Sequence, residues 1–280
     1  MEDLQIIRER FAEDLRYKAN LRSNAVIRAF AEVEREHFLG PGPWQIYNVF
    51  GAYYWPTPDA DPRHIYHDVL VAIDPKRLLN NGQPSGLAFL IEALELQPGA
   101  QVVHLGCGTG YYTAILAHVV GGGGRVIAVE LDANLANRAA DNLRTLKQVK
   151  VVATDASRYH FEEADAILVN AGATRLMPIW LDGLRPAGRL LLPLTMASGS
   201  GQVLKIERRE QGFAARFIMG LVIFNCAGAR DPQEEENLQK AFLRGDSYLV
   251  SSLRRKPHDV EGSCWLHSDD SCLSKLDETS

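Results

Sequence analysis

Three glycines at alternate positions follow a short apolar run in the segment VVHLGCGTGYYTA, 102–114. Gly106, Gly108 and Gly110 leave this part of the backbone without side chains, and a stretch with helical spacing begins directly after them. A glycine turn between a strand and a helix lets a ligand approach the backbone closely, as in many nucleoside-cofactor sites. The segment therefore indicates a cofactor site, although glycines alone also form tight structural turns.

The spacing of the glycines separates the candidate cofactors. A Walker phosphate loop is excluded because no Gly-Lys-Ser/Thr follows. The dinucleotide fingerprint Gly-x-Gly-x-x-Gly/Ala is not met, since the third glycine comes one place early and Tyr111 stands where a small residue is needed. Glu130 follows at the end of the next expected strand and could bind a ribose diol in NAD or in S-adenosylmethionine. The Gly-x-Gly-x-Gly spacing favours S-adenosylmethionine.

The elements around this turn alternate between strands and helices. Apolar spacings of three and four predict one helix over 2–19 and a second that starts at Ser23 and ends before GPGP at 40–43, and Pro84 begins a third. Strands are expected at 101–105, 125–130, 149–154, 164–170 and 188–194, with helices at 111–120 and 132–146. The alternation predicts an α/β fold with a parallel sheet. An antiparallel hairpin (202–210 and 213–224), a polar helix (232–242) and a loop-like tail are expected to follow.

The segment WQIYNVFGAYYWPTPD, 44–59, is rich in aromatic residues and interrupted by prolines. The prolines exclude a long helix, so an irregular segment is expected. Its rings could pack the N-terminal helices onto the main domain, or they could form a lid or an acceptor wall. Packing is the favoured interpretation because aromatic side chains bury a large area wherever they lie.

Composition excludes several classes of protein. The 280 residues are 46% hydrophobic and carry a net charge of −5, which argues against a nucleic-acid binder. Apolar runs stay shorter than the ~18 residues of a membrane span, and the charged start MEDLQIIRER does not resemble a signal peptide. Four cysteines do not make a disulfide scaffold. We expect a cytoplasmic protein with neither nucleic acid nor membrane as partner, and we make no prediction of its oligomeric state.

Several segments resemble known methyltransferases. HLGCGTGYYTAILAHVV, VIAVELD and VVATDAS resemble the first three motifs of the seven-strand S-adenosylmethionine-dependent methyltransferases. Residues 82–120, together with IYHDVLVAID (65–74), are similar to protein-L-isoaspartate O-methyltransferases, and the resemblance extends over about 25–228. It implies a class I, Rossmann-like methyltransferase domain at 80–228, preceded by a helical and aromatic extension (1–79) and followed by a helix and tail (229–280).

The resemblance also implies roles for individual residues. Gly106, Cys107, Gly108, Thr109 and Gly110 would line the methionine and ribose of S-adenosylmethionine. Glu130 would hold the ribose diol, Asp155 and Ala156 would lie at the adenine, and Asn170 would border the methyl group. These residues all follow expected parallel strands, where open α/β sheets bind ligands. Taken alone, Asp155 could also be an ordinary helix N-cap.

Two positions depart from the family pattern. His104 stands where the family usually has an acid, which weakens the contacts expected around the amino group of the cofactor. In the acceptor loop, Asn81, Gly82 and Gln83 occupy the place of Ser-Gln-Pro and its neighbours, so the serine hydroxyl that would orient an acceptor is replaced by Gly82. Asn80, Asn81 or Ser85 could substitute for that hydroxyl, or the loop could serve another acceptor.

The expected reaction is methyl transfer from S-adenosylmethionine to a carboxylate of a protein or peptide. A carboxylate acceptor needs no general base, so the absence of a Ser-His-Asp set is no objection. An alcohol or amine acceptor would need one, and His64, His67 and His104 would then be candidates. The alternatives are a methyltransferase for a different acceptor, such as a small molecule or modified peptide, a non-catalytic S-adenosylmethionine-binding module, and a nicotinamide oxidoreductase.

The tail contains residue types that bind metals. Cys264-x2-His267-x4-Cys272 follows His258. Structural zinc sites usually have four ligands in tighter pairs, so we expect no metal site here and treat these side chains as packing on the domain.

Overall fold

The computed structural model describes residues 3–255 and 258–277, which form two compact units. The first comprises the described residues of Met1–Gly99, with Cys107–Ala128 and Asp132–Val152. The second comprises Ala100–Gly106, Val129–Leu131 and the described residues of Ala153–Ser280. The chain passes between the units several times, so the units do not correspond to consecutive segments of the sequence. The division predicted from the sequence, at 1–79, 80–228 and 229–280, stays a prediction of which segments carry which function. Within the described ranges, no helix has both the length and the apolar character needed to cross a membrane.

The first unit contains the helices expected from the sequence, except that the single helix expected from Ser23 to before residue 40 is divided into two between Glu32 and Arg35. They are α1 (Leu4–Lys18), α2 (Asn24–Glu32), α3 (Arg35–Leu39), α4 (Pro84–Ala93), α5 (Tyr111–Val120) and α6 (Ala133–Leu143). The hydroxyl of Ser23 caps α2 by accepting from Val26 N at 3.3 Å, as predicted. The fully buried ring of Phe30 meets Tyr111 and Tyr112 edge-on, at centroid distances of 6.3 and 6.5 Å. This aromatic contact packs α2 against the start of α5.

The aromatic segment is a hairpin rather than an irregular stretch. Strands β1 (Gln45–Asn48) and β2 (Tyr53–Pro56) pair antiparallel, and a small second pair, β3 (Ala72–Asp74) and β4 (Leu79–Asn80), follows. Short 3-10 turns, η1 (Pro62–Ile65) and η2 (Pro75–Arg77), separate these strands. Trp44 is buried, but the tip residue Phe50 is 99% exposed. The expectation that the rings of this segment pack the N-terminal helices onto the main domain is therefore contradicted for Phe50, Tyr53 and Trp55, which are exposed because a hairpin alternates its side chains between two faces and its tip reaches solvent.

The sheet confirms the α/β class but is larger than seven strands. In the described residues it has ten strands in the order β13-β14-β12-β11-β10-β9-β8-β5-β6-β7. Their bounds are β5 (Gln101–Leu105), β6 (Arg125–Glu130), β7 (Val149–Ala153), β8 (Ala164–Val169), β9 (Leu184–Thr195), β10 (Ser200–Arg208), β11 (Phe213–Val222), β12 (Ser252–Arg254), β13 (Cys264–His267) and β14 (Cys272–Ser274). The pairs β5–β8 and β8–β9 are parallel and β10–β11 is antiparallel, as the sequence predicted, and β9 also pairs antiparallel with β10.

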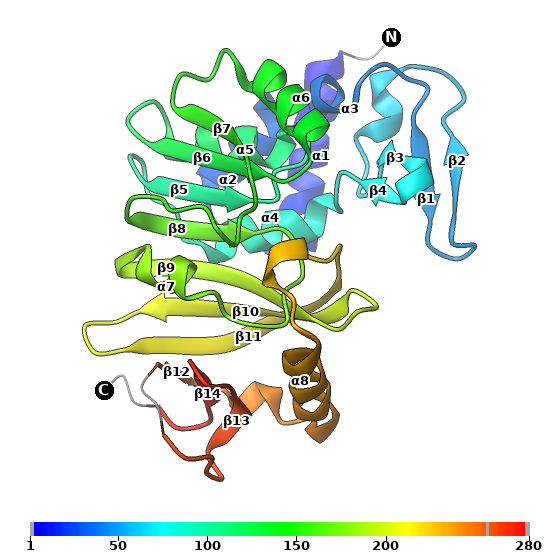
Figure 1. Ribbon diagram of the computed structural model, residues 1–280. Coiled ribbons are helices and arrows are strands. Elements are labelled where there is room, and N and C mark those ends of the chain that lie inside the picture. The colour runs from blue at the N-terminus through cyan, green and yellow to red at the C-terminus, as the bar shows by residue number, and fades with distance from the viewer. Residues whose placement is uncertain (1–2, 256–257, 278–280) are drawn as a thin grey trace. The chain divides into compact units, whose positions relative to one another are not determined.

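The three additional strands correct the prediction of a loop-like tail. In the second unit, β12, β14 and β13 continue the sheet from β11, near α8 (Pro232–Arg244) in Figure 1. The fully buried Trp265 packs against Phe217 and Phe242, at centroid distances of 4.9 and 5.4 Å. This ring cluster holds the strand extension to β11 and α8. The remaining helices of this unit are α7 (Pro178–Asp182), η3 (Ala227–Ala229) and η4 (Ser247–Leu249).

Candidate cofactor site and acceptor loop

In the second unit, backbone hydrogen bonds bring the ends of four strands together. Gly106 N donates to Val129 O at 2.8 Å, and Thr154 N donates to Glu130 O at 2.9 Å. Asn170 N donates to Leu105 O at 2.8 Å. The predicted residues at the ends of β5, β6, β7 and β8 therefore lie along one edge of the sheet, which is the usual position of a ligand site in an open α/β sheet.

Position 106 requires glycine, both because of its backbone conformation and because Asn170 lies close to it. Its φ of +81° lies in the left-handed region, and a Cβ there would be 3.3 Å from Asn170 O. The side chain of Asn170 donates from Nδ2 to Gly106 O at 3.4 Å. Asn170 and the first glycine thus fix one another, and the predicted place of Asn170 beside the reactive end of a cofactor stays a prediction.

Asp155 and Ala156 form a tight turn at the end of β7. Asp155 Oδ1 accepts from Ser157 N at 2.9 Å and from Ser157 Oγ at 2.8 Å, so this oxygen organises its own turn. The buried indole of Trp180 donates to Ala156 O at 3.0 Å. Gly228 lies so close that a Cβ there would overlap Ser157 Oγ and the Asp155 carboxylate. The other oxygen, Oδ2, lies 4.0 Å from Nε of Arg158, and the predicted contact of Asp155 with adenine stays a prediction.

The rest of the glycine turn belongs to the first unit. Gly108 and Gly110 have φ values of +57° and +96°. Gly110 precedes α5, and a Cβ there would be 2.7 Å from Leu143 Cδ1 on α6. The third glycine therefore permits close packing of two helices, whereas a Cβ on Gly108 would meet nothing nearer than Ile73 Cδ1 at 3.9 Å. Of these two glycines, Gly108 has the more open surroundings and is the better candidate for ligand contact.

His104 occupies the position of the family acid on β5. Its side chain is fully buried, and this burial lowers the pKa of the imidazole to about 4. The imidazole is consequently neutral at pH 7. A neutral ring cannot replace the charge of a carboxylate toward an ammonium group, so the departure noted in the sequence has an electrostatic consequence.

The acceptor loop is held on both sides within the first unit. Asp68 accepts from Ser85 N at 2.9 Å and from Gln83 Nε2 at 3.3 Å. On the other side, the hydroxyl of Tyr112 on α5 donates to Gly82 O at 3.3 Å. Because α5 begins directly after the glycine turn, Tyr112 connects the acceptor loop to the cofactor motif.

Gly82 and Asn81 have distinct local environments. Gly82 has a φ of +76°, its N–H donates to Asn80 Oδ1 at 2.9 Å, and a Cβ there would be 3.1 Å from Leu87 Cδ2. Asn81 N donates to Val71 O at 2.8 Å. The side chain of Asn81 is buried, and its Nδ2 finds no hydrogen-bond partner among the described residues. An orphaned buried donor is costly unless a ligand accepts from it.

Arg35, which nothing in the sequence singles out, supports the segment before the acceptor loop. Its guanidinium is fully buried and donates to the carbonyls of Ile65, His67 and Val69 at 2.6, 3.0 and 2.8 Å. These bonds fix the backbone on either side of Asp68. A single arginine in a helical stretch gives no signal of this role in the sequence.

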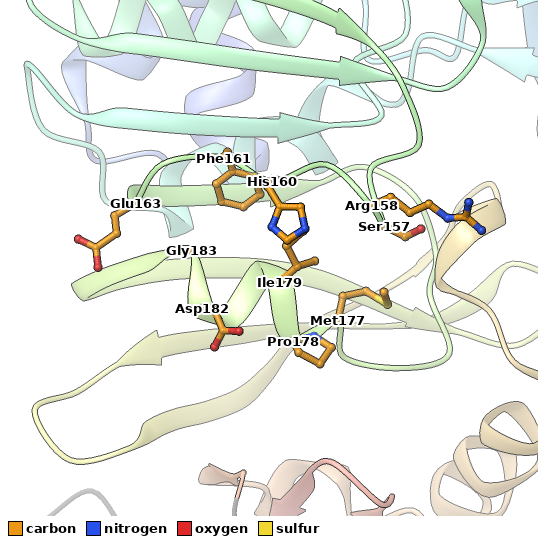
Figure 2. A pocket seen from close by; sticks show the side chains of 10 residues that line it. All are labelled: Ser157, Arg158, His160, Phe161, Glu163, Met177, Pro178, Ile179, Asp182 and Gly183. Carbon is orange, nitrogen blue, oxygen red and sulfur yellow. The ribbon is translucent and has the colours of Figure 1, made fainter.

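A cleft of about 620 Å³ lies elsewhere in the second unit (Figure 2). Its wall includes His160 and Phe161 from the loop after Ser157, and Pro178 and Ile179 from α7. Ser157 belongs to this wall, but none of the predicted cofactor residues does. The cleft therefore lies beside the Asp155 turn and is not the predicted cofactor site.

Comparison with known proteins identifies relatives. The family model described as protein-L-isoaspartate(D-aspartate) O-methyltransferase (PCMT) matches residues 57–230. Protein-L-isoaspartate O-methyltransferase 2 of Archaeoglobus fulgidus is 30% identical over 221 residues, covering 78% of this chain and 90% of that protein. A solved protein-L-isoaspartate O-methyltransferase has a TM-score of 0.66 at 19% identity, covering 95% of this chain and 87% of the other. A Plasmodium falciparum structure, titled as a putative enzyme of this kind in complex with S-adenosyl-L-homocysteine, has a TM-score of 0.61 at 19% identity, covering 79% and 98%.

Proposed function

Since the chain belongs to the protein-L-isoaspartate(D-aspartate) O-methyltransferase family and is an S-adenosylmethionine-dependent enzyme of that family, we propose that it methylates isoaspartyl carboxylates of proteins or peptides. This membership sets aside the nicotinamide oxidoreductase considered from the sequence. The observation that carries the proposal is the hydrogen bond from Tyr112 to Gly82, which joins the acceptor loop to the helix that begins at the glycine turn.

The residues at the strand ends fit the cofactor. Gly106, Gly108 and Gly110 have positive φ values, which only glycine adopts without strain, and Gly108 leaves its backbone open to a ligand. Glu130 offers a carboxylate for the ribose diol and Asp155 offers Oδ2 for the adenine amine. Cys107, Thr109, Ala156 and Asn170 complete the proposed binding set. When bound, S-adenosylmethionine supplies a methyl group activated by the positive sulfonium.

The acceptor loop has the task of alignment. A carboxylate is already ionised at neutral pH, so the protein needs to orient it and exclude water rather than remove a proton. We assign the orientation to Asn81, whose buried Nδ2 is available to donate to a carboxylate oxygen. Gln83 is held by Asp68 and keeps its side-chain carbonyl oxygen for the acceptor peptide. A carboxylate oxygen of the acceptor would form the new O–CH3 bond as the S–CH3 bond of the bound cofactor breaks. The electron pair of the broken S–CH3 bond stays on sulfur.

We further propose that the enzyme works in the cytoplasm on protein acceptors. The four cysteines are all unpaired with one another, which supports a reducing compartment. The hairpin strands are tied to the segment before the acceptor loop, since Tyr47 N donates to Leu70 O at 2.9 Å and Tyr54 Oη donates to Leu78 O at 3.1 Å. The exposed aromatic tip of the same hairpin offers a surface suited to peptide.

The test compares two peptides that differ only in one linkage. Initial rates of labelled methyl transfer are measured with an isoaspartyl peptide and with its normal aspartyl twin, and the methylated atom is located by mass spectrometry. We expect turnover of the isoaspartyl peptide only. Transfer to a metabolite pool but to neither peptide would indicate a different acceptor. Tight S-adenosylhomocysteine binding without any methylated product would indicate a binding module.

A further inference from the structure

Four metal-ligating side chains that the sequence did not predict as a site meet in the C-terminal strand extension. The ligand atoms of His258, Cys264, His267 and Cys272 all lie within 4.8 Å of one another. His258 Nε2 is 3.4 Å from Cys264 Sγ, and that sulfur is 3.9 Å from His267 Nδ1. Zinc bonds of about 2.3 Å to sulfur and 2.0 Å to nitrogen imply tetrahedral S–N separations of about 3.5 Å. The two measured separations bracket this value.

A β-bulge places these side chains on one face. The register of β13 on β14 pairs Cys264 with Ser274, Leu266 with Leu273 and His267 with Cys272, so Trp265 is the extra residue. In a regular strand, residues three apart point to opposite faces. The bulge brings Cys264 and His267 to the same side as Cys272. It also sends the ring of Trp265 into its contact with Phe217 and Phe242.

The surroundings of the cluster suit a structural metal. Glu261 N donates to Cys264 Sγ at 3.5 Å, the kind of backbone bond that supports a thiolate. The turn between the two strands is closed by Ser268 N donating to Ser271 O at 2.8 Å, which fixes His267 and Cys272 relative to one another. The rings of His258 and His267 are 4.8 Å apart and nearly perpendicular, so their nitrogens converge on the sulfurs without stacking.

We propose that His258, Cys264, His267 and Cys272 form a structural zinc site that stabilises the β12–β14–β13 extension of the sheet. Two thiolates and two imidazoles in a tetrahedral arrangement are a preferred ligand set of zinc, and four protein ligands leave no open position for catalysis. In the strand order, five strands (β14, β12, β11, β10 and β9) separate β13 from β8 at the candidate cofactor site. The zinc therefore has no part in methyl transfer. It supplements the limited apolar packing that three short strands can provide.

The primary test is the metal content of the full chain. We expect one zinc ion per chain in protein purified under reducing conditions without chelator, measured by plasma mass spectrometry after gel filtration. After zinc removal, cobalt(II) addition is expected to produce the thiolate charge-transfer band and the intense visible bands of tetrahedral cobalt. These two readouts use the unmodified chain and do not depend on how well a variant folds.

Variants assign the ligands. Cys264→Ser and Cys272→Ser are expected to lose bound zinc, whereas Cys226→Ser, which changes a buried cysteine outside the cluster, is expected to keep it. Zinc removal by chelator should lower the melting temperature of the unmodified chain and leave that of Cys264→Ser unchanged. Methyl transfer measured below the melting temperature should persist in both.

Several results would overturn the proposal. A reduced chain that takes up neither zinc nor cobalt has no such site. Stoichiometric zinc in the Cys264→Ser/Cys272→Ser double variant would place the metal elsewhere. A Cys264–Cys272 disulfide in the protein as isolated, or stoichiometric iron or copper in place of zinc, would assign a different role to the cluster.

Discussion

Gly82 lacks the hydroxyl that a serine would supply at this position, and its backbone conformation makes any larger residue there unfavourable. Its φ of +76° is strained for any other residue, and a Cβ would press on Leu87 at 3.1 Å. We therefore expect Gly82→Ser and Gly82→Ala each to lower the free energy of unfolding by about 1–3 kcal/mol, measured by urea denaturation. Because both variants carry the same strain, the alanine variant is the control for the hydroxyl.

The ratio of activities between these two variants isolates the missing hydrogen bond. A hydrogen bond to a charged group contributes about 1.5–3 kcal/mol. If the hydroxyl orients the carboxylate, Gly82→Ser should exceed Gly82→Ala in kcat/KM for an isoaspartyl peptide by about tenfold or more. Equal rates would mean that residue 82 does not touch the acceptor carboxylate.

Asn81 is the proposed donor to the acceptor carboxylate. Its buried Nδ2 has no partner among the described residues, whereas its backbone N–H bonds to Val71 O and does not depend on the side chain. Asn81→Ala should reduce kcat/KM for the isoaspartyl peptide by about tenfold to a hundredfold through the lost bond. Asn81→Asp should reduce it further because the new carboxylate repels that of the acceptor. Calorimetry with S-adenosylhomocysteine should give an unchanged Kd for both, and a weakened Kd would assign Asn81 to the cofactor instead.

The buried imidazole of His104 makes the stability of the chain depend on pH. Burial lowers its pKa to about 4, against 6.5 in the unfolded chain. Between these values the unfolded state binds a proton that the folded state does not, so stability falls as the pH falls from 6.5 toward 4. The full loss is about 3 kcal/mol. His104→Gln, which cannot titrate, should show a shallower decline in urea denaturation over this range, and parallel curves would contradict the assignment.

At the scale of elements, η3 and the turn after β7 depend on one another. A Cβ on Gly228 would overlap Ser157 Oγ and the Asp155 carboxylate, so Gly228→Ala must displace the turn that presents Asp155 and Ala156. We expect the Kd of S-adenosylhomocysteine to rise by at least about tenfold, which corresponds to 1.4 kcal/mol. Gly220→Ala on β11 is the control, since its Cβ would meet only Gly201 O at 3.8 Å. An unchanged Kd for Gly228→Ala would separate the Asp155 turn from cofactor binding.

The elements that the sequence predicted well are those with long apolar signals. Strands β5 and β6 and helix α5 have the predicted bounds because each is a largely apolar stretch that ends at a glycine or a charged residue. The tail was missed because β12 and β14 have three residues each, too few for a two-residue alternation to be visible. The hairpin of β1 and β2 was missed because its prolines masked four-residue strands.

The same limit applies to the site. Glycine spacing and strand ends indicated the cofactor residues, since these follow from local sequence. Arg35 bonds to carbonyls that are 30 to 34 positions away in the sequence. Tyr112 bonds to Gly82, which is 30 positions away. The metal-ligating cluster depends on a bulge at Trp265. Such tertiary relations leave no periodic signal in the sequence.

At the scale of the whole molecule, neither compact unit is a continuous segment. The second unit takes β5 and the end of β6 from a region of the chain that otherwise belongs to the first. Strand β8 pairs with β5 from Val102↔Ala166 to Leu105↔Val169, and the β8 residues Ala166, Ile167, Leu168 and Val169 are buried. A fragment beginning at 153 would keep β8 but expose this apolar edge, which favours aggregation.

We therefore expect residues 153–280 expressed alone to be aggregated or to unfold without a sharp thermal transition. The comparison is a second fragment in which residues 100–106 are joined to 153–280 by a Gly/Ser linker, so that β5 can cover β8. This second fragment should be more soluble, and gel filtration with circular dichroism on heating should show a more compact species with a steeper transition. Zinc is added to both samples so that the proposed metal site in the tail has the same occupancy in the two fragments. If 153–280 alone were monomeric with a sharp melting transition, β5 would not be required for the folding of the second unit.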